Sequence, residues 1–114
     1  MGTSTVKRNP SKHSSGNWVW WEFSNGLIVG HFYVSALTFT TSTASGQVFR
    51  TSSAITVETP PFSFNYGSTS LQPGGQSVWA TNINTTATGV KCYFVCGASG
   101  SKTIGISGIF VGVK

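Results

Sequence analysis

The chain has 114 residues, of which 8% are charged and 13% are aromatic, and its formal net charge is +5. This length fits one domain. The high content of aromatic and β-branched residues excludes a disordered chain. We find no run of about 18 apolar residues and no apolar segment near the N-terminus. We therefore expect neither membrane insertion nor a signal peptide.

The positive charges are not clustered. Lys7, Arg8 and Lys12 lie near the N-terminus, whereas Arg50 and three further lysines are scattered. A nucleic-acid surface needs lysine and arginine side chains gathered on one face. We expect no nucleic-acid partner.

Residues 1–16 lack apolar periodicity and are rich in serine, lysine and glycine, which predicts a flexible leader or linker. The domain is then expected over residues 17–114.

The first predicted hairpin begins directly after this leader. Side chains alternate along residues 18–24, the pair Asn25-Gly26 favours a type I′ turn, and residues 27–36 form the returning strand. Six more strands are predicted near residues 47–51, 54–58, 62–66, 76–83, 90–96 and 103–113, separated by segments rich in Gly, Ser, Thr, Asn or Pro.

About eight short strands without a helical apolar stripe predict an all-β fold, either an antiparallel β-sandwich or a small barrel of jelly-roll type. The choice of inner face in each strand is open. The predicted core is Val19, Trp21, Ile28, Phe32, Val34, Phe49, Ile55, Val57, Phe64, Val78, Ile83, Tyr93, Val95, Ile106 and Phe110.

Two features of the last strands need an explanation. Glycines at 105, 108 and 112 indicate either a close neighbouring subunit or a bulge, and both alternatives stay open. Cys92 and Cys96 lie four residues apart in a predicted strand, about 13 Å from each other, beyond the roughly 7 Å that a disulfide tolerates. We expect two half-buried free thiols.

The residues of common catalytic sites are sparse. The sequence has no aspartate, so it cannot form a Ser-His-Asp triad, and Glu22 and Glu58 are the only pair of carboxylates for a glycosidase. A zinc site would need ligands beyond the two cysteines. We expect no enzyme, no metal and no cofactor, with a small glycoside-cleaving enzyme as the least favoured alternative.

The aromatic residues exceed what so small a core can bury, and Trp and Tyr suit ligand contact because each has an apolar face and a polar group. We predict a ligand site that includes Trp79, Tyr66, Trp18 and Trp20, with polar contacts from Asn82 and Asn84.

The segment WVWWEFSNGLIVGHF at residues 18–32, with Ser24, Asn25 and Gly26 at its turn, resembles the start of C-terminal receptor-binding (head) domains of bacteriophage tail fibre and baseplate proteins. The similarity continues through TPPFSF at residues 59–64, a Ser-Val-Trp strand, an Asn-Thr-Thr loop and a glycine-containing last strand. It departs at the end, because such domains often finish close to an aromatic residue and this sequence finishes Gly-Val-Lys.

The resemblance implies a homotrimeric β-sandwich at the distal tip of a phage tail, which recognises saccharides on the host cell surface during adsorption. Its partners would be a bacterial saccharide, two further copies of the chain and other tail or baseplate proteins. Two alternatives remain: a structural fibre-tip domain that only trimerises, or a monomeric carbohydrate-binding module of a secreted bacterial protein, in an extracellular or cell-surface location.

Overall fold

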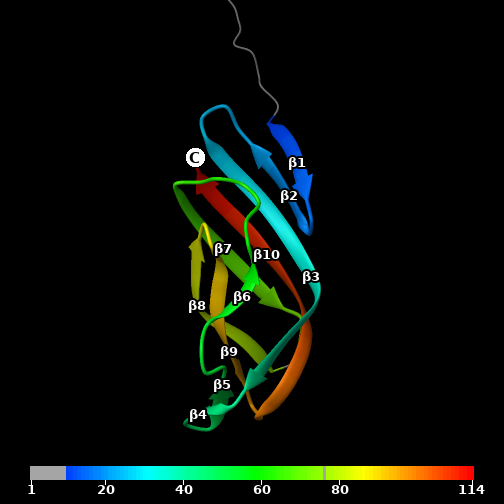
Figure 1. The fold of residues 1–114 in the computed structure, drawn as a ribbon, viewed down its shortest axis with the longest axis vertical. Coiled ribbons are helices and arrows are strands. Elements are labelled where there is room, and N and C mark those ends of the chain that lie inside the picture. Colours follow the sequence, from blue (N-terminus) through cyan, green and yellow to red (C-terminus); the bar gives the residue numbers. More distant parts are fainter. Residues whose placement is uncertain (1–9, 76) are drawn as a thin grey trace, which may run out of the picture.

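The computed structural model describes residues 10–75 and 77–114, which form ten antiparallel β-strands and no helix (Figure 1). The predicted all-β class is confirmed, and the two sheets face each other without closing into a barrel. No helix in these two ranges is long and apolar enough to cross a membrane. The strands are β1 (Ser11–Ser15), β2 (Trp18–Glu22), β3 (Leu27–Thr41), β4 (Thr43–Ser45), β5 (Val48–Arg50), β6 (Ile55–Glu58), β7 (Tyr66–Pro73), β8 (Val78–Thr86), β9 (Gly89–Cys96) and β10 (Gly100–Val113).

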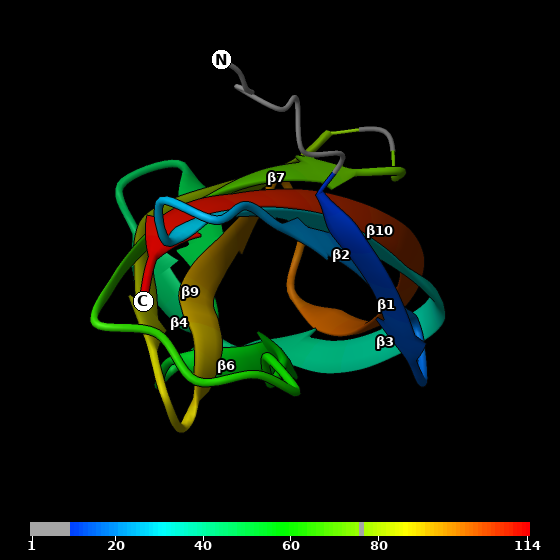
Figure 2. The same cartoon turned by 90° about the horizontal axis from the view of Figure 1, so that it is seen from above.

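The first sheet has the order β1-β2-β3-β10-β7 and is built on two long strands. β3 and β10 pair along almost their whole length, and 14 residues of β10 span about 46 Å at 3.3 Å per residue (Figure 1). In the second sheet β9 is central, with β8 along one edge and β5 and β6 along the other. Figure 2, seen from above, shows the first sheet curving around the interior, which β6 and β9 enclose from the opposite side.

The first sheet includes part of the predicted leader. Residues 11–15 form β1, which pairs with β2 across the two-residue turn Gly16-Asn17. Gly16 has a φ of 57°, and glycine at the first position of such a turn is typical of type II′. The domain boundary expected at residue 17 is therefore placed too late, and residues 1–9 of the predicted leader lie outside the described residues.

The β2–β3 hairpin is confirmed, but its predicted turn type is wrong. The Gly26 amide donates to the Phe23 carbonyl, Leu27 and Phe23 close a three-residue loop, and the Asn25 side chain accepts from the Leu27 amide. Only Gly26 has positive φ in this turn, at 93°. A three-residue loop with glycine at its last position matches a type I turn followed by a bulge, rather than type I′.

The segment around residue 66 also differs from the prediction. Residues 62–65 form a loop, and the polar segment that was expected to be a separator forms β7 instead, paired with β10 over eight residues. β7 lies at the edge of the sheet. Its small polar side chains are tolerated there because one face meets solvent, and Pro73 at its end interrupts no ladder.

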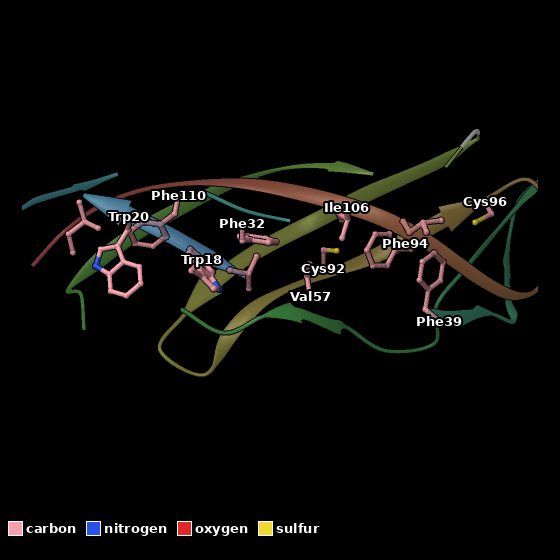
Figure 3. Close-up of a cluster of buried hydrophobic side chains, with 13 residues drawn as sticks. Trp18, Trp20, Phe32, Phe39, Val57, Cys92, Phe94, Cys96, Ile106 and Phe110 are labelled. Atoms are coloured by element: carbon pink, nitrogen blue, oxygen red, sulfur yellow. The ribbon is translucent and has the colours of Figure 1, made fainter. Parts of the chain in front are cut away.

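The core has an aromatic end around Trp18 and Phe110 and a second end around Phe39 and Phe94, whose rings stack at 4.3 Å between centroids (Figure 3). The loop after β6 covers the aromatic end, where the Phe62 ring packs against both Trp18 and Trp20. The buried apolar residues are Trp18, Trp20, Ile28, Phe32, Phe39, Val57, Val90, Cys92, Phe94, Cys96, Ile104, Ile106 and Phe110.

The predicted core is right in β3, β6 and β10, wrong in β2 and β9, and wrong at one residue of β8. In β2 the buried side chains are Trp18 and Trp20, so Val19 and Trp21 lie on the outer face. In β9 the buried side chains are Cys92, Phe94 and Cys96, so Tyr93 and Val95 lie outside. Ile83, also predicted in the core, is 38% exposed.

The glycines of β10 make room for aromatic rings of the same chain. A Cβ at Gly108 would collide with the Phe32 ring, and one at Gly112 with the Phe110 ring. Gly105 lies at the register shift between Ile104 and Ile106, which is a bulge, and a Cβ there would collide with the Tyr33 hydroxyl. Of the two alternatives, the bulge is therefore confirmed for Gly105. Gly108 and Gly112 follow neither, because a Cβ there would meet atoms of this chain: the Phe32 ring at Gly108, and the Tyr66 carbonyl and the Phe110 ring at Gly112.

Both thiols are free, as predicted, and buried more deeply than expected. Burial raises the pKa of Cys92 to about 12. Its thiol therefore stays protonated at neutral pH and packs as a small apolar group.

Candidate functional site

The six predicted ligand-binding residues do not form one site. Trp18 and Trp20 are 2% and 7% exposed, so burial removes both from the candidate ligand contacts. Tyr66 is 71% exposed at the start of β7 in the first sheet. Trp79, Asn82 and Asn84 all lie on β8 in the second sheet, and Trp79 is 55% exposed.

Trp18 and Trp20 point inward, where their rings are buried and their indole groups find acceptors at the edge of the core. Trp18 Nε1 donates to Glu58 at 2.9 Å and Trp20 Nε1 donates to Glu22 at 3.1 Å. A buried indole N–H without an acceptor would be costly. Both side-chain carboxylates of the chain thus serve as partners of core tryptophans.

These contacts also bear on the glycosidase alternative. Lys114 Nζ lies 2.9 Å from Glu22, and the hydrogen bonds from Lys114 and from the Trp20 indole lower the pKa of this carboxyl. A general acid in a glycosidase needs a raised pKa. Glu22 therefore has the opposite electrostatic environment from a catalytic acid.

The outer face of the second sheet brings together a different set of side chains around Tyr93. A pocket of about 250 Å³ is lined by Arg50, Thr81, Asn82 and Tyr93. The pairing of β5 and β8 with β9 brings these residues together: Thr81 pairs with Tyr93, while Val95 pairs with both Trp79 and Arg50. Trp79, Val95 and Arg50 therefore lie side by side across three strands, two residues along β9 from the Thr81–Tyr93 pair. The exposed Trp79 side chain thus lies next to the pocket.

A bulge in β8 shapes this pocket. Asn82 and Ile83 lie in the register shift between Thr81 and Asn84, and Asn82 has a φ of 53°. Asparagine tolerates this left-handed conformation better than most residues, and bulges redirect side chains out of the regular alternation. Asn82 thereby lines the pocket, whereas Asn84 pairs with Lys91 one row further on.

The pocket combines one aromatic ring, one cation and two neutral polar groups. The Arg50 guanidinium lies 5.4 Å from the centroid of Tyr93, which fixes it over the ring, and Nη1 donates to the Thr51 carbonyl. The Thr81 hydroxyl donates to the Tyr93 carbonyl at 3.3 Å. Aromatic faces beside amide and hydroxyl groups can hold a sugar ring by stacking and hydrogen bonding.

Three pockets are larger than the Tyr93 pocket: two lie around residues 60–65, and one of about 280 Å³ lies beside Cys96. We favour the Tyr93 pocket over them. One of about 490 Å³ is lined by Ser63, Phe64, Asn65 and Lys114. Phe64 there packs against the core aromatic Phe110. The Tyr93 pocket is smaller, but more of its polar groups converge beside an exposed tryptophan, which is the better mark of recognition.

Sequence reasoning missed Arg50, Thr81 and Tyr93. Arg50 counted only as a scattered charge, and Tyr93 was placed in the core. The pattern of β9 could have exposed the second error, because an inward Cys92-Phe94-Cys96 set requires Tyr93 to point outward.

Within residues 10–75 and 77–114, no group of three His, Cys, Asp or Glu side chains could hold a metal ion. Comparison of the chain with protein-family models, with curated proteins and with solved structures finds no match.

Proposed function

We propose that this chain is a receptor-binding head domain of a phage tail that recognises a saccharide on the host cell surface. The observation that carries the proposal is the outer face of the second sheet, where Trp79 lies exposed beside the Tyr93 pocket. The sequence resemblance supplies the biological setting: a virion, a trimer, a jelly-roll type of sandwich and neighbouring tail or baseplate proteins.

The opposite face of the molecule supports the homotrimer. Along β10, Ile109, Val111 and Val113 are 57%, 48% and 38% exposed on the outer side of the first sheet. Register extends this surface sideways to Trp21 and Val29. We name the apolar outer face by its members: Val19, Trp21, Leu27, Val29, Tyr33, Ile109, Val111 and Val113.

Further copies of the chain are the occupant that best fits this face. An exposed apolar patch of this kind is unusual on a monomer. Its titratable neighbours are few: His31, which pairs with both Val19 and Ile109, and Lys12, which pairs with Trp21 on the edge hairpin. Because the saccharide pocket lies on the second sheet, assembly through the first sheet would leave it open. Three such pockets on one tip would strengthen weak saccharide binding by avidity.

The test is binding of the full chain to an array of neutral and acidic bacterial surface saccharides, with Trp79→Ala as the variant. We expect the variant to lose about fivefold or more in affinity, because a stacked aromatic ring contributes roughly 1–3 kcal/mol. Tyr66→Ala is the matched control, since it removes an exposed aromatic ring from the other sheet. Because Tyr66 pairs with Val113 beside the apolar outer face, light scattering must show that this variant keeps the wild-type mass.

The same array distinguishes the saccharide-binding head domain from a structural fibre-tip domain that only trimerises. The apolar outer face favours both of them. A trimer that binds no saccharide on the array, or whose binding is unchanged by Trp79→Ala, would contradict the proposed recognition and favour the structural role.

A further inference from the structure

Arg50 is held in place with most of its donors unused. A guanidinium has five N–H donors in a planar fork that matches a carboxylate or phosphate group. Among the described residues, the Arg50 side chain makes one hydrogen bond, from Nη1 to the Thr51 carbonyl at 3.0 Å. Stacking over Tyr93 restrains the rest of the group at the wall of the pocket.

The positive charges around this pocket, on Arg50 and Lys91, have no carboxylate partner among the described residues. Lys91 lies on the same outer face, two residues from Tyr93, and its register partners are Asn84 and Thr56. Across residues 10–75 and 77–114 the structure contains one ion pair, Lys114 with Glu22. Glu58, the other side-chain carboxylate, accepts from Asn17 and Trp18.

We infer that the pocket binds an acidic saccharide, with Arg50 contacting the carboxylate or phosphate of the sugar while Tyr93 and Trp79 contact its rings. The inference rests on the proposed saccharide recognition and narrows it to one ligand class. Asn82 and Thr81 offer neutral donors and acceptors for sugar hydroxyls. Lys91 adds a second positive charge for the next acidic unit of a polymer.

A nucleic acid is the less suitable anion. Its affinity grows with the number of phosphates neutralised, and this face offers Arg50 and Lys91 rather than a continuous row of cations. A saccharide with one acidic group per ring needs one guanidinium group held beside an aromatic surface. Arg50 beside Tyr93 has this arrangement.

The experiment titrates the full chain with trigalacturonate, with its methyl ester and with poly(glycerol phosphate) that carries sugar substituents. The methyl ester keeps the ring and the linkages and removes the charge. Tight binding of trigalacturonate assigns a carboxylate, and tight binding of the glycerol phosphate polymer assigns a phosphate. We expect Arg50→Gln to weaken the preferred acidic ligand about tenfold or more, because a charge-assisted pair contributes roughly 1.5–3 kcal/mol.

Two further variants keep the result interpretable. Lys102→Gln removes the same charge from the pocket near Cys96 and is expected to change binding less than twofold. Arg50→Lys keeps the charge and loses the fork, so it should bind with intermediate affinity. Far-ultraviolet circular dichroism confirms that each variant is folded.

Three results would overturn the inference. They are equal binding of the acid and its methyl ester, an Arg50→Gln effect no larger than that of Lys102→Gln, or equally tight binding of an oligothymidylate. If neutral array saccharides bind and acidic ones do not, the inference fails while the proposed function stands. If the chain binds no saccharide at all, both fail.

Discussion

Glu22 joins a surface ion pair to a core tryptophan. Its carboxylate accepts from Lys114 Nζ at 2.9 Å and from the Trp20 indole at 3.1 Å, and both contacts lower its pKa. A depressed pKa in the folded state means that the ionised carboxylate stabilises the fold at pH values above 4.5, its ordinary pKa. This contribution is lost as pH falls through the lower, folded pKa.

We therefore expect Glu22→Gln to flatten the acid side of the stability profile. The amide still offers an oxygen to Trp20 but no longer pairs with Lys114 as an ion, so the loss at pH 7 should stay within about 1 kcal/mol. Chemical denaturation at pH 7, 5 and 3 measures this. A wild type and a variant that lose the same stability between pH 7 and pH 3 would show that the Glu22 contacts do not set the acid response.

At the scale of the element, inward-facing large and small residues alternate in the first sheet. Phe32 pairs with Trp18 on one side and with Gly108 on the other, and Gly30 lies between Trp20 and Phe110. The Phe32 ring lies against Gly108, and the Phe110 ring lies against Gly67 and Gly112, so the glycines leave room for these two rings on the inner face of the sheet. Contacts within this chain, rather than with another subunit, explain both glycines: the Phe32 ring at Gly108, and the Tyr66 carbonyl with the Phe110 ring at Gly112.

Gly108→Ala tests the arrangement. The added methyl would collide with the Phe32 ring, and overpacking of this kind typically costs about 1–3 kcal/mol. Gly97→Ala is the matched control, because nothing lies within 4 Å of the position where its Cβ would be. Thermal unfolding of the two variants should therefore differ by several degrees, with Gly108→Ala the less stable. Equal melting temperatures would contradict the close packing of Phe32 on Gly108.

Sequence patterns predicted some elements well and failed at others for identifiable reasons. The β2–β3 hairpin was predictable because Asn25-Gly26 separates two apolar strands. The inner face of β2 was not, because WVWWE carries large apolar side chains on both faces. What decides it is long-range: Trp18 reaches Glu58, 40 residues away, and no local pattern contains that hydrogen bond.

Local sequence patterns also failed to predict the two polar strands, β1 and β7. β1 and β7 have few apolar residues, so their composition is that of loops, and they become strands because β2 and β10 offer them an edge to pair with. At the candidate site, residue type alone pointed to Trp79 and Asn82. Arg50 joins them only through the register of β5 on β9, which the sequence does not reveal.

At the scale of the whole molecule, the two sheets have outer faces of different character. The second sheet exposes Trp79 with the polar pocket around Tyr93, whereas the first exposes Ile109, Val111 and Val113 side by side with Trp21 and Val29. Separate faces for binding and for assembly are consistent with the proposed trimer.

Val111→Lys tests that assembly, because it places a charge at the centre of the apolar outer face where the side chain is 48% exposed. An isolated chain should tolerate this lysine, while a trimer that buries the face should dissociate, since desolvating an unpaired charge costs several kcal/mol. Light scattering after size exclusion should give about 36 kDa for the wild type, three times the 12.0 kDa chain, and 12.0 kDa for the variant.

Thr103→Lys is the matched control, as an exposed outer position on the same strand beyond the apolar outer face, and it should remain trimeric. A variant Val111→Lys that stays at 36 kDa would place the contact between copies elsewhere. A wild-type mass of 12.0 kDa would remove the trimer itself. The apolar outer face would then have to contact a different protein, and a monomeric carbohydrate-binding module would become the better description of a chain whose second sheet still binds saccharide.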